Sequence, residues 1–179
     1  KRDLLESEWP VADFLKGGGD HLYRNDGLPV SLPSGGRKGG FVEVTKQTGI
    51  HGTLISFGLG VSVGDVNNDG YPDVYVANDS YERDYLYINQ RDGTFKDEME
   101  ECIEQNSVSS MGSDIADVNN DGYPDIFTTD MLPGDDYRLK TLGAFDNIDL
   151  YNTRLKVGLY RQFMKNCLMV NNQKGEFIE

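Results

Sequence analysis

The sequence predicts an all-β fold assembled from four-stranded antiparallel units. One observation is an acidic loop of nine residues that occurs twice, 52 residues apart, at residues 65–73 and 117–125. The other is a strand, turn and strand pattern that occurs three times along the chain of 179 residues. Each acidic loop lies between two segments with strand character, so one loop followed by one hairpin supplies four strands.

Both acidic loops read Asp-Val-Asn-Asn-Asp-Gly-Tyr-Pro-Asp. Oxygen side chains stand at loop positions 1, 3, 5 and 9, and the Gly at position 6 permits a sharp turn. A hard cation such as calcium takes about 6–8 oxygen ligands at roughly 2.3–2.6 Å. We therefore expect two Ca²⁺ ions, one in each loop.

The expected ligands are the same set in both loops, with the residue at position 7 contributing its backbone carbonyl. They are Asp65, Asn67, Asp69, Tyr71 and Asp73 for the first ion, and Asp117, Asn119, Asp121, Tyr123 and Asp125 for the second. An ordinary surface turn rich in Asn and Asp is the simpler alternative. The presence of two identical copies favours the metal site over an ordinary turn. A second argument is that three converging carboxylates repel one another unless a cation lies between them.

The segments around the loops distinguish this pattern from a helical calcium-binding hand. Such a hand has a bidentate Glu at position 12 and a helix after it, whereas position 12 is Val76 in the first copy and Thr128 in the second. The segments after the loops are rich in β-branched and aromatic residues, and the segments before them alternate with period two. Strands are expected at residues 60–64, 73–77, 112–116 and 125–129.

The hairpin pattern consists of a strand that ends at Asn, a turn that contains Gly, and a short returning strand with an aromatic residue. Its three copies are residues 20–25 with 40–43, 84–89 with 93–97, and 166–171 with 175–179. The first copy holds an insertion at residues 28–39 that is rich in Gly, Pro and Ser.

A repeat of about 40–55 residues with four strands is the period of a β-propeller blade. The whole chain, residues 1–179, is therefore interpreted as part of one propeller. The expected parts are a partial blade at 1–56, a blade at 57–108 around loop 65–73, and a blade at 109–179 around loop 117–125 with a partly helical insertion at 130–165.

The two loop regions, residues 60–76 and 112–127, resemble FG-GAP or VCBS-type repeats, which form the blades of integrin α propellers. Phe57 and Gly58 also resemble the start of such a repeat, although the second copy has Ser109 and Ser110 there. Residues 129–138 and the pairing of hairpin with loop look closer to the bacterial ASPIC/UnbV-like cell-surface group. The resemblance implies a calcium-stabilised, non-catalytic propeller module on an extracytoplasmic bacterial protein, acting in binding, adhesion or as a scaffold.

Length limits this interpretation, because a closed propeller needs about four or more blades. The chain has room for two complete units and part of a third, so we expect it to be a fragment. The remainder of its own propeller, or another copy, is expected to cover the open blade ends. The ligand of such a module would be a protein or a glycan.

Composition excludes some partners. The formal net charge is -13, and six of the negative charges lie in the two loops, so two calcium ions would bring the net charge to about -9. An acidic chain lacks the basic footprint that nucleic acid or an anionic membrane surface requires. No apolar run approaches the ~20 residues of a membrane span, and no signal peptide is recognisable.

The insertion carries Tyr151, Leu155, Leu159 and Phe163 at four-residue spacing, which predicts one apolar helix face. It also holds six Lys or Arg against two Asp between residues 138 and 165. Insertions on propeller repeats often form the binding face. We favour the alternative, a helix that covers the blade edge while its charges are solvated.

An enzyme is the rival interpretation, namely a piece of a glycan hydrolase or lyase whose active site lies mostly elsewhere. No catalytic residue is assigned, because His21 and His51 lie in no recognisable catalytic or metal motif. A helical calcium sensor is disfavoured by the strands around the loops. Cys102, in a short acidic helix, and Cys167, in a hairpin strand, could form a disulfide, but two buried thiols are the favoured expectation.

Overall fold

The computed structural model describes residues 19–27, 30–31, 37–51, 53, 56–79, 82–141 and 148–179. Residues 1–18 of the expected partial blade therefore lie outside the described residues. Strands predominate in the described part of the chain, and the larger sheets are four-stranded and antiparallel, which confirms the predicted all-β fold. The boundaries of the individual blades stay predictions.

Two sheets repeat the same order of strands. The first contains β5 (Phe57–Gly64), β6 (Asp73–Asp79), β7 (Tyr85–Asn89) and β8 (Phe95–Asp97), each antiparallel to the next. The second contains β10 (Gly112–Ala116), β11 (Asp125–Thr129), β13 (Cys167–Asn171) and β14 (Phe177–Ile178). All four predicted loop-flanking strands and both hairpins of these units are confirmed.

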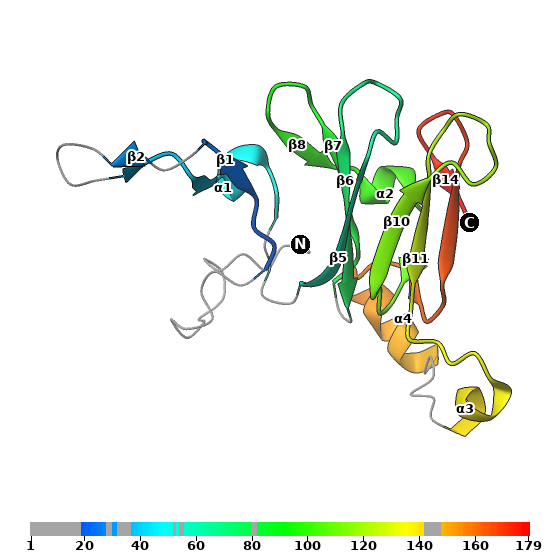
Figure 1. Ribbon diagram of the computed structural model, residues 1–179. Helices are drawn as coiled ribbons and strands as arrows, with labels where there is room; N and C mark the ends of the chain where they lie inside the picture. The colour runs from blue at the N-terminus through cyan, green and yellow to red at the C-terminus, as the bar shows by residue number, and fades with distance from the viewer. Residues whose placement is uncertain are drawn as a thin grey trace, which may run out of the picture.

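The third predicted hairpin is also present, near the N-terminus. It pairs β1 (Tyr23–Asn25) with β4 (Phe41–Glu43), and its insertion forms the short pair β2 (Val30–Ser31) and β3 (Arg37–Lys38). A four-residue helix, α1 (Thr45–Thr48), leads from it toward β5. These strands lie to one side of the first four-stranded sheet (Figure 1).

The main core lies between the two four-stranded sheets. Tyr75 and Leu86 of the first sheet and Ile126 and Met169 of the second are fully buried in one apolar cluster. Alternation places them there, since every second residue of these strands faces the neighbouring sheet. The helix α2 (Met99–Cys102) and the short strand β9 (Asn106–Ser107) connect the sheets, and Met99 joins the same cluster.

The insertion differs from the prediction of one continuous helix. It contains α3 (Asp136–Thr141), α4 (Ile148–Lys156) and the strand β12 (Gln162–Phe163), which pairs in parallel with β9. The predicted apolar helix face was therefore too long. The helix α4 ends before Gly158, which has a left-handed φ of 86°. This conformation allows Leu159 N–H to donate to the Arg154 carbonyl at 2.9 Å, as at many helix C-termini. Tyr151 and Phe163 still pack together, with ring centroids 5.1 Å apart.

Figure 1 shows the two acidic loops and the β7–β8 and β13–β14 turns at one end of the sheets, and α3 and α4 at the opposite end. Both cysteines are free thiols, Cys167 buried and Cys102 half-buried beside the core, so the disulfide alternative does not apply. In the part of the chain that the structure describes, no helix is long and apolar enough to cross a membrane.

Candidate metal centre

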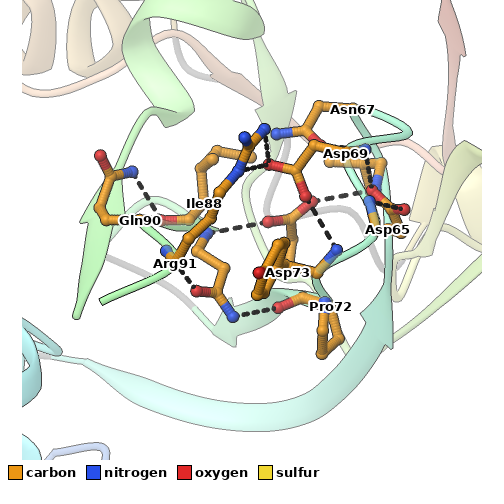
Figure 2. Close-up of polar contacts among 12 residues, drawn as sticks. Asp65, Asn67, Asp69, Pro72, Asp73, Ile88, Gln90 and Arg91 are labelled. Carbon is orange, nitrogen blue, oxygen red and sulfur yellow. Dashed lines mark hydrogen bonds and ion pairs between the residues drawn. The ribbon is translucent and has the colours of Figure 1, made fainter. Parts of the chain in front are cut away.

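The first acidic loop is anchored by its last residue. Asp73 opens β6 and is fully buried. Its Oδ2 accepts a hydrogen bond from Val66 N–H at 3.0 Å, and its Oδ1 accepts one from Asn89 N–H at 2.9 Å (Figure 2). One carboxylate therefore ties the start of the loop to its end and to the neighbouring hairpin.

The turn itself is built from the other carboxylates. Asp65 accepts hydrogen bonds from Asp69 N–H at 2.9 Å and from Gly70 N–H at 2.7 Å, each on a different oxygen. Asn67 Oδ1 also accepts from Asp69 N–H, at 3.0 Å. Gly70 has a φ of 88°, which a residue with a Cβ adopts only with strain, so the sequence needs Gly at this position.

The second loop repeats this geometry. Asp125 accepts from Val118 N–H at 3.0 Å and from Asn171 N–H at 2.8 Å. Asp117 accepts from Asp121 N–H at 3.1 Å and from Gly122 N–H at 2.8 Å. The identical sequences thus fold into matching hydrogen-bond networks, because these bonds join groups within one short segment or its own blade.

The tyrosines at loop position 7 use their backbone N–H groups in the turn. Tyr71 N–H donates to Asp69 Oδ1 at 2.8 Å, and Tyr123 N–H donates to Asp121 Oδ1 at 2.9 Å. Asn119 Oδ1 accepts from Asp121 N–H at 2.9 Å, as Asn67 does for Asp69 in the first loop. All ten predicted ligand residues therefore lie in the two turns, five in each.

Sequence reasoning missed four residues that complete the loops, all from the hairpin that follows each of them. Asn89 and Asn171 donate from their amide groups to the carbonyls of the loop prolines, at 3.1 and 3.2 Å. The Arg91 guanidinium donates to Asp69 Oδ2 at 2.9 and 3.1 Å (Figure 2). In the second loop, Gln173 Nε2 donates to Asp121 Oδ2 at 3.1 Å. The recurrent Asn at the end of each hairpin strand was the available signal for the first pair.

The two loops also contact each other. Asn68 Nδ2 donates to the Gly122 carbonyl at 2.8 Å, and Asn171 Nδ2 donates to the Val66 carbonyl at 2.8 Å. The second bond joins the hairpin of the second sheet to the first loop, across 105 positions of sequence. The loops are therefore held together as one surface at the end of the two sheets.

The electrostatics of the first loop reflect the crowding of its carboxylates. Burial raises the pKa of Asp73, hydrogen bonds from Asn89 and Val66 oppose the rise, and the negative charges of Asp69 and Asp65 add to it. The pKa of Asp69 lies below its ordinary value, because hydrogen bonds from Arg91 and Tyr71 outweigh its desolvation. The loop carboxylates thus interact with one another even in this arrangement.

The donor set fits calcium in its chemistry, since each loop offers carboxylate and amide oxygens alone, in the order that calcium loops use. By distance, no three His, Cys, Asp or Glu side chains among the described residues lie close enough together to ligate one ion. Binding would therefore require the carboxylates of a loop to rotate toward one another. Calcium binding stays a prediction.

Comparison with known proteins gives a family for this region. Residues 65–128 match the model of the FG-GAP-like repeat. Over 119 residues, 59% of this chain, the sequence is 29% identical to integrin alpha-3 of Cricetulus griseus, and over 86 residues, 42% of the chain, it is 36% identical to integrin alpha-6 of Gallus gallus. Integrin alpha-3 of Mus musculus is 31% identical over 97 residues, 47% of the chain.

The aligned segments make up 11%, 8% and 9% of the lengths of these three relatives, so the chain spans a small part of each. No solved structure matches the chain. The predicted FG-GAP and integrin α-like character is confirmed for the matched repeat, whereas the expected closeness to the ASPIC/UnbV-like group stays a prediction.

Proposed function

Residues 65–128 are an FG-GAP-like repeat similar to integrin α chains, and from this premise we propose that the chain is a calcium-binding, non-catalytic β-propeller module. The module acts in binding or adhesion, or as a scaffold, on an extracytoplasmic protein. The single observation that carries the proposal is the pair of identical oxygen-donor loops, built with matching hydrogen bonds at the same end of two successive sheets.

Calcium has a structural role in this proposal. The negative charges of Asp65 and Asp69 act unfavourably on the Asp73 carboxylate within one short turn, and a divalent cation would convert that repulsion into attraction. The binding free energy then counts toward folding, because the unfolded chain lacks the assembled site. The ion would pin the turn between the first two strands of each blade and so fix the blade edge.

Calcium affinities of extracellular modules are about 10⁻⁴–10⁻³ M. Such an affinity suffices where calcium is millimolar, which is consistent with a location outside the cytoplasm. The proposed partners are the remainder of the same propeller or another copy at the open sheet faces, and a protein or glycan ligand on the loops.

Thermal unfolding with calcium and with chelator tests the proposal on the wild type and on the variants Asp69→Ala and Asp121→Ala. At about 100 times the dissociation constant, one bound ion adds about 2.7 kcal/mol to the free energy of unfolding. For a chain of this size that is a rise in Tm of about 5–10 °C per site. Each variant should lose the rise that belongs to its own loop.

A matched control is Asp114→Ala, which removes one exposed carboxylate from β10 without touching either loop. Its calcium-dependent rise in Tm should equal that of the wild type. A wild-type Tm that is the same in calcium and in chelator would sink the proposal and leave both loops as ordinary turns.

A further inference from the structure

The hairpin after each loop places one side chain on that loop, and the two side chains differ in charge. Arg91 and Gln173 occupy equivalent positions, two residues after the hairpin Asn, with φ angles of 63° and 64°. In both hairpins the backbone N–H of this residue donates to the Asn side chain, at 2.9 Å. The left-handed backbone turns both side chains toward the preceding acidic loop.

Both side chains reach the same oxygen of the carboxylate at loop position 5. Arg91 forms an ion pair of 2.9 Å with Asp69 Oδ2, whereas Gln173 donates a neutral hydrogen bond of 3.1 Å to Asp121 Oδ2. The guanidinium also lies over the ring of Tyr71, 5.6 Å from the ring centroid. Arg91 is therefore held at the first loop by a ligand carboxylate and by an aromatic face.

We propose that Arg91 competes with calcium for the first loop, so that the second loop binds calcium more tightly and fills first. This proposal rests on the proposed function. To bind at the first loop, calcium must either displace Arg91 from the Asp69 carboxylate or bind beside the positive charge of Arg91. Each alternative costs free energy. At the second loop, Asp121 Oδ2 accepts only from the neutral amides of Gln173 and Asn119, each at 3.1 Å, so calcium displaces no charged group there.

The asymmetry has a consequence for the calcium-free protein. The first loop keeps one positive charge among its three carboxylates, while the described contacts give the second loop no such cation. The negative charge of the first loop is therefore partly neutralised by Arg91 when no metal is bound. The second loop relies on calcium for compensation, which suits a site that fills at lower calcium concentration.

Calcium titrations followed by calorimetry test the proposal, with one loop disabled at a time. Asp121→Ala leaves the first loop and Asp69→Ala leaves the second. We expect the first loop to bind calcium about three- to tenfold more weakly than the second, since an exposed ion pair and one nearby charge contribute modestly. Arg91→Gln in the Asp121→Ala background should remove this difference, and Gln173→Arg in the Asp69→Ala background should weaken the second loop by a similar factor.

Two controls separate charge from shape and from distant effects. Arg91→Lys keeps the positive charge and should keep the weak first site. Arg24→Gln removes another exposed arginine, which pairs with Asp26 in a different hairpin, and should leave both affinities unchanged.

The outcomes are distinguishable, and melting curves check that each variant is folded. Changed affinities in the two exchange variants support the proposal. Equal affinities that neither exchange alters overturn this inference alone, while the proposed function stands. Absence of calcium binding by either loop in every variant overturns the proposed function and this inference with it.

Discussion

At the scale of single residues, the most consequential group outside the loops is the carboxyl of Asp84. It is fully buried where the two sheets meet. It accepts hydrogen bonds from Tyr75 Oη at 2.6 Å, Ser110 Oγ at 2.7 Å and Asn78 N–H at 2.8 Å. Burial nevertheless raises its pKa from 3.8 to about 6, although these hydrogen bonds act in the opposite direction.

Stability should therefore depend on pH through Asp84. The folded-state pKa of Asp84 lies above its ordinary value, so protonation of this carboxyl stabilises the folded state. That contribution to the free energy of unfolding is fully present below pH 3.8 and is lost as the pH rises through about 6. Asp84→Asn cannot titrate, so the free energy of unfolding of the wild type relative to the variant should fall by up to about 3 kcal/mol across that window. Urea unfolding over a pH series in chelator measures the difference. A difference that stays constant with pH would contradict the assignment.

The residues of the two acidic turns could be predicted because the hydrogen bonds that shape each turn join residues within the nine-residue loop. Asp65 and Gly70 belong to one turn whose chemistry is local. Arg91 lies 22 residues from Asp69, and nothing in the sequence alone places its side chain on that carboxylate. Such a contact depends on how the hairpin packs against the loop, which is a property of the folded blade.

At the scale of elements, the two sheets approach closely where β5 lies against β10. Ser62 Oγ donates to the Ser113 carbonyl at 2.7 Å across this contact. Small residues permit the approach, since a Cβ added at Gly60 would lie 2.9 Å from the Cα of Gly112. Glycine in a strand usually weakens it, so its presence here indicates a packing requirement.

Gly60→Ala should therefore lower the free energy of unfolding by about 1–3 kcal/mol, because the added methyl group pushes two backbones apart. Gly112→Ala is the matched control on the facing strand, where the nearest atom to an added Cβ is Thr129 Oγ1 at 3.7 Å, an ordinary contact. Chemical denaturation of both variants measures the contrast. Equal stability of the two would mean that the sheets can shift apart without cost.

The strands and hairpins could be predicted because period-two alternation and turn residues are local signals. The secondary structure of the insertion was predicted less accurately than that of the strands and hairpins. Leu159 continues the four-residue spacing of α4, yet Gly158 ends the helix in a left-handed conformation. Phe163 then lies in β12, whose pairing with β9 joins segments more than 50 residues apart. Non-local pairing of so short a strand leaves no periodic signal in the sequence.

At the scale of the whole molecule, the second sheet has one apolar face turned away from the core. Phe127 and Leu168 are paired across β11 and β13, and they are 40% and 41% exposed. Ile178 on β14 is 62% exposed on the same face. Strand alternation puts Ile126 and Met169 into the core and these neighbours outside it. A face of this kind is where a stacked blade would bury apolar area.

We expect the chain of 179 residues to associate with itself through this face. Burying one large apolar side chain contributes about 1.5–3 kcal/mol, and tenfold in affinity corresponds to about 1.4 kcal/mol. Phe127→Ser with Leu168→Ser should therefore raise the dissociation constant of self-association by about tenfold or more, as measured by sedimentation velocity over a concentration series. Tyr137→Ser, which removes a 77% exposed aromatic side chain from α3, is the control and should leave association unchanged. A stable monomer at every concentration would refute the coverage of this face by another copy, because the exposed Phe127 and Leu168 would then be solvated at no measurable cost.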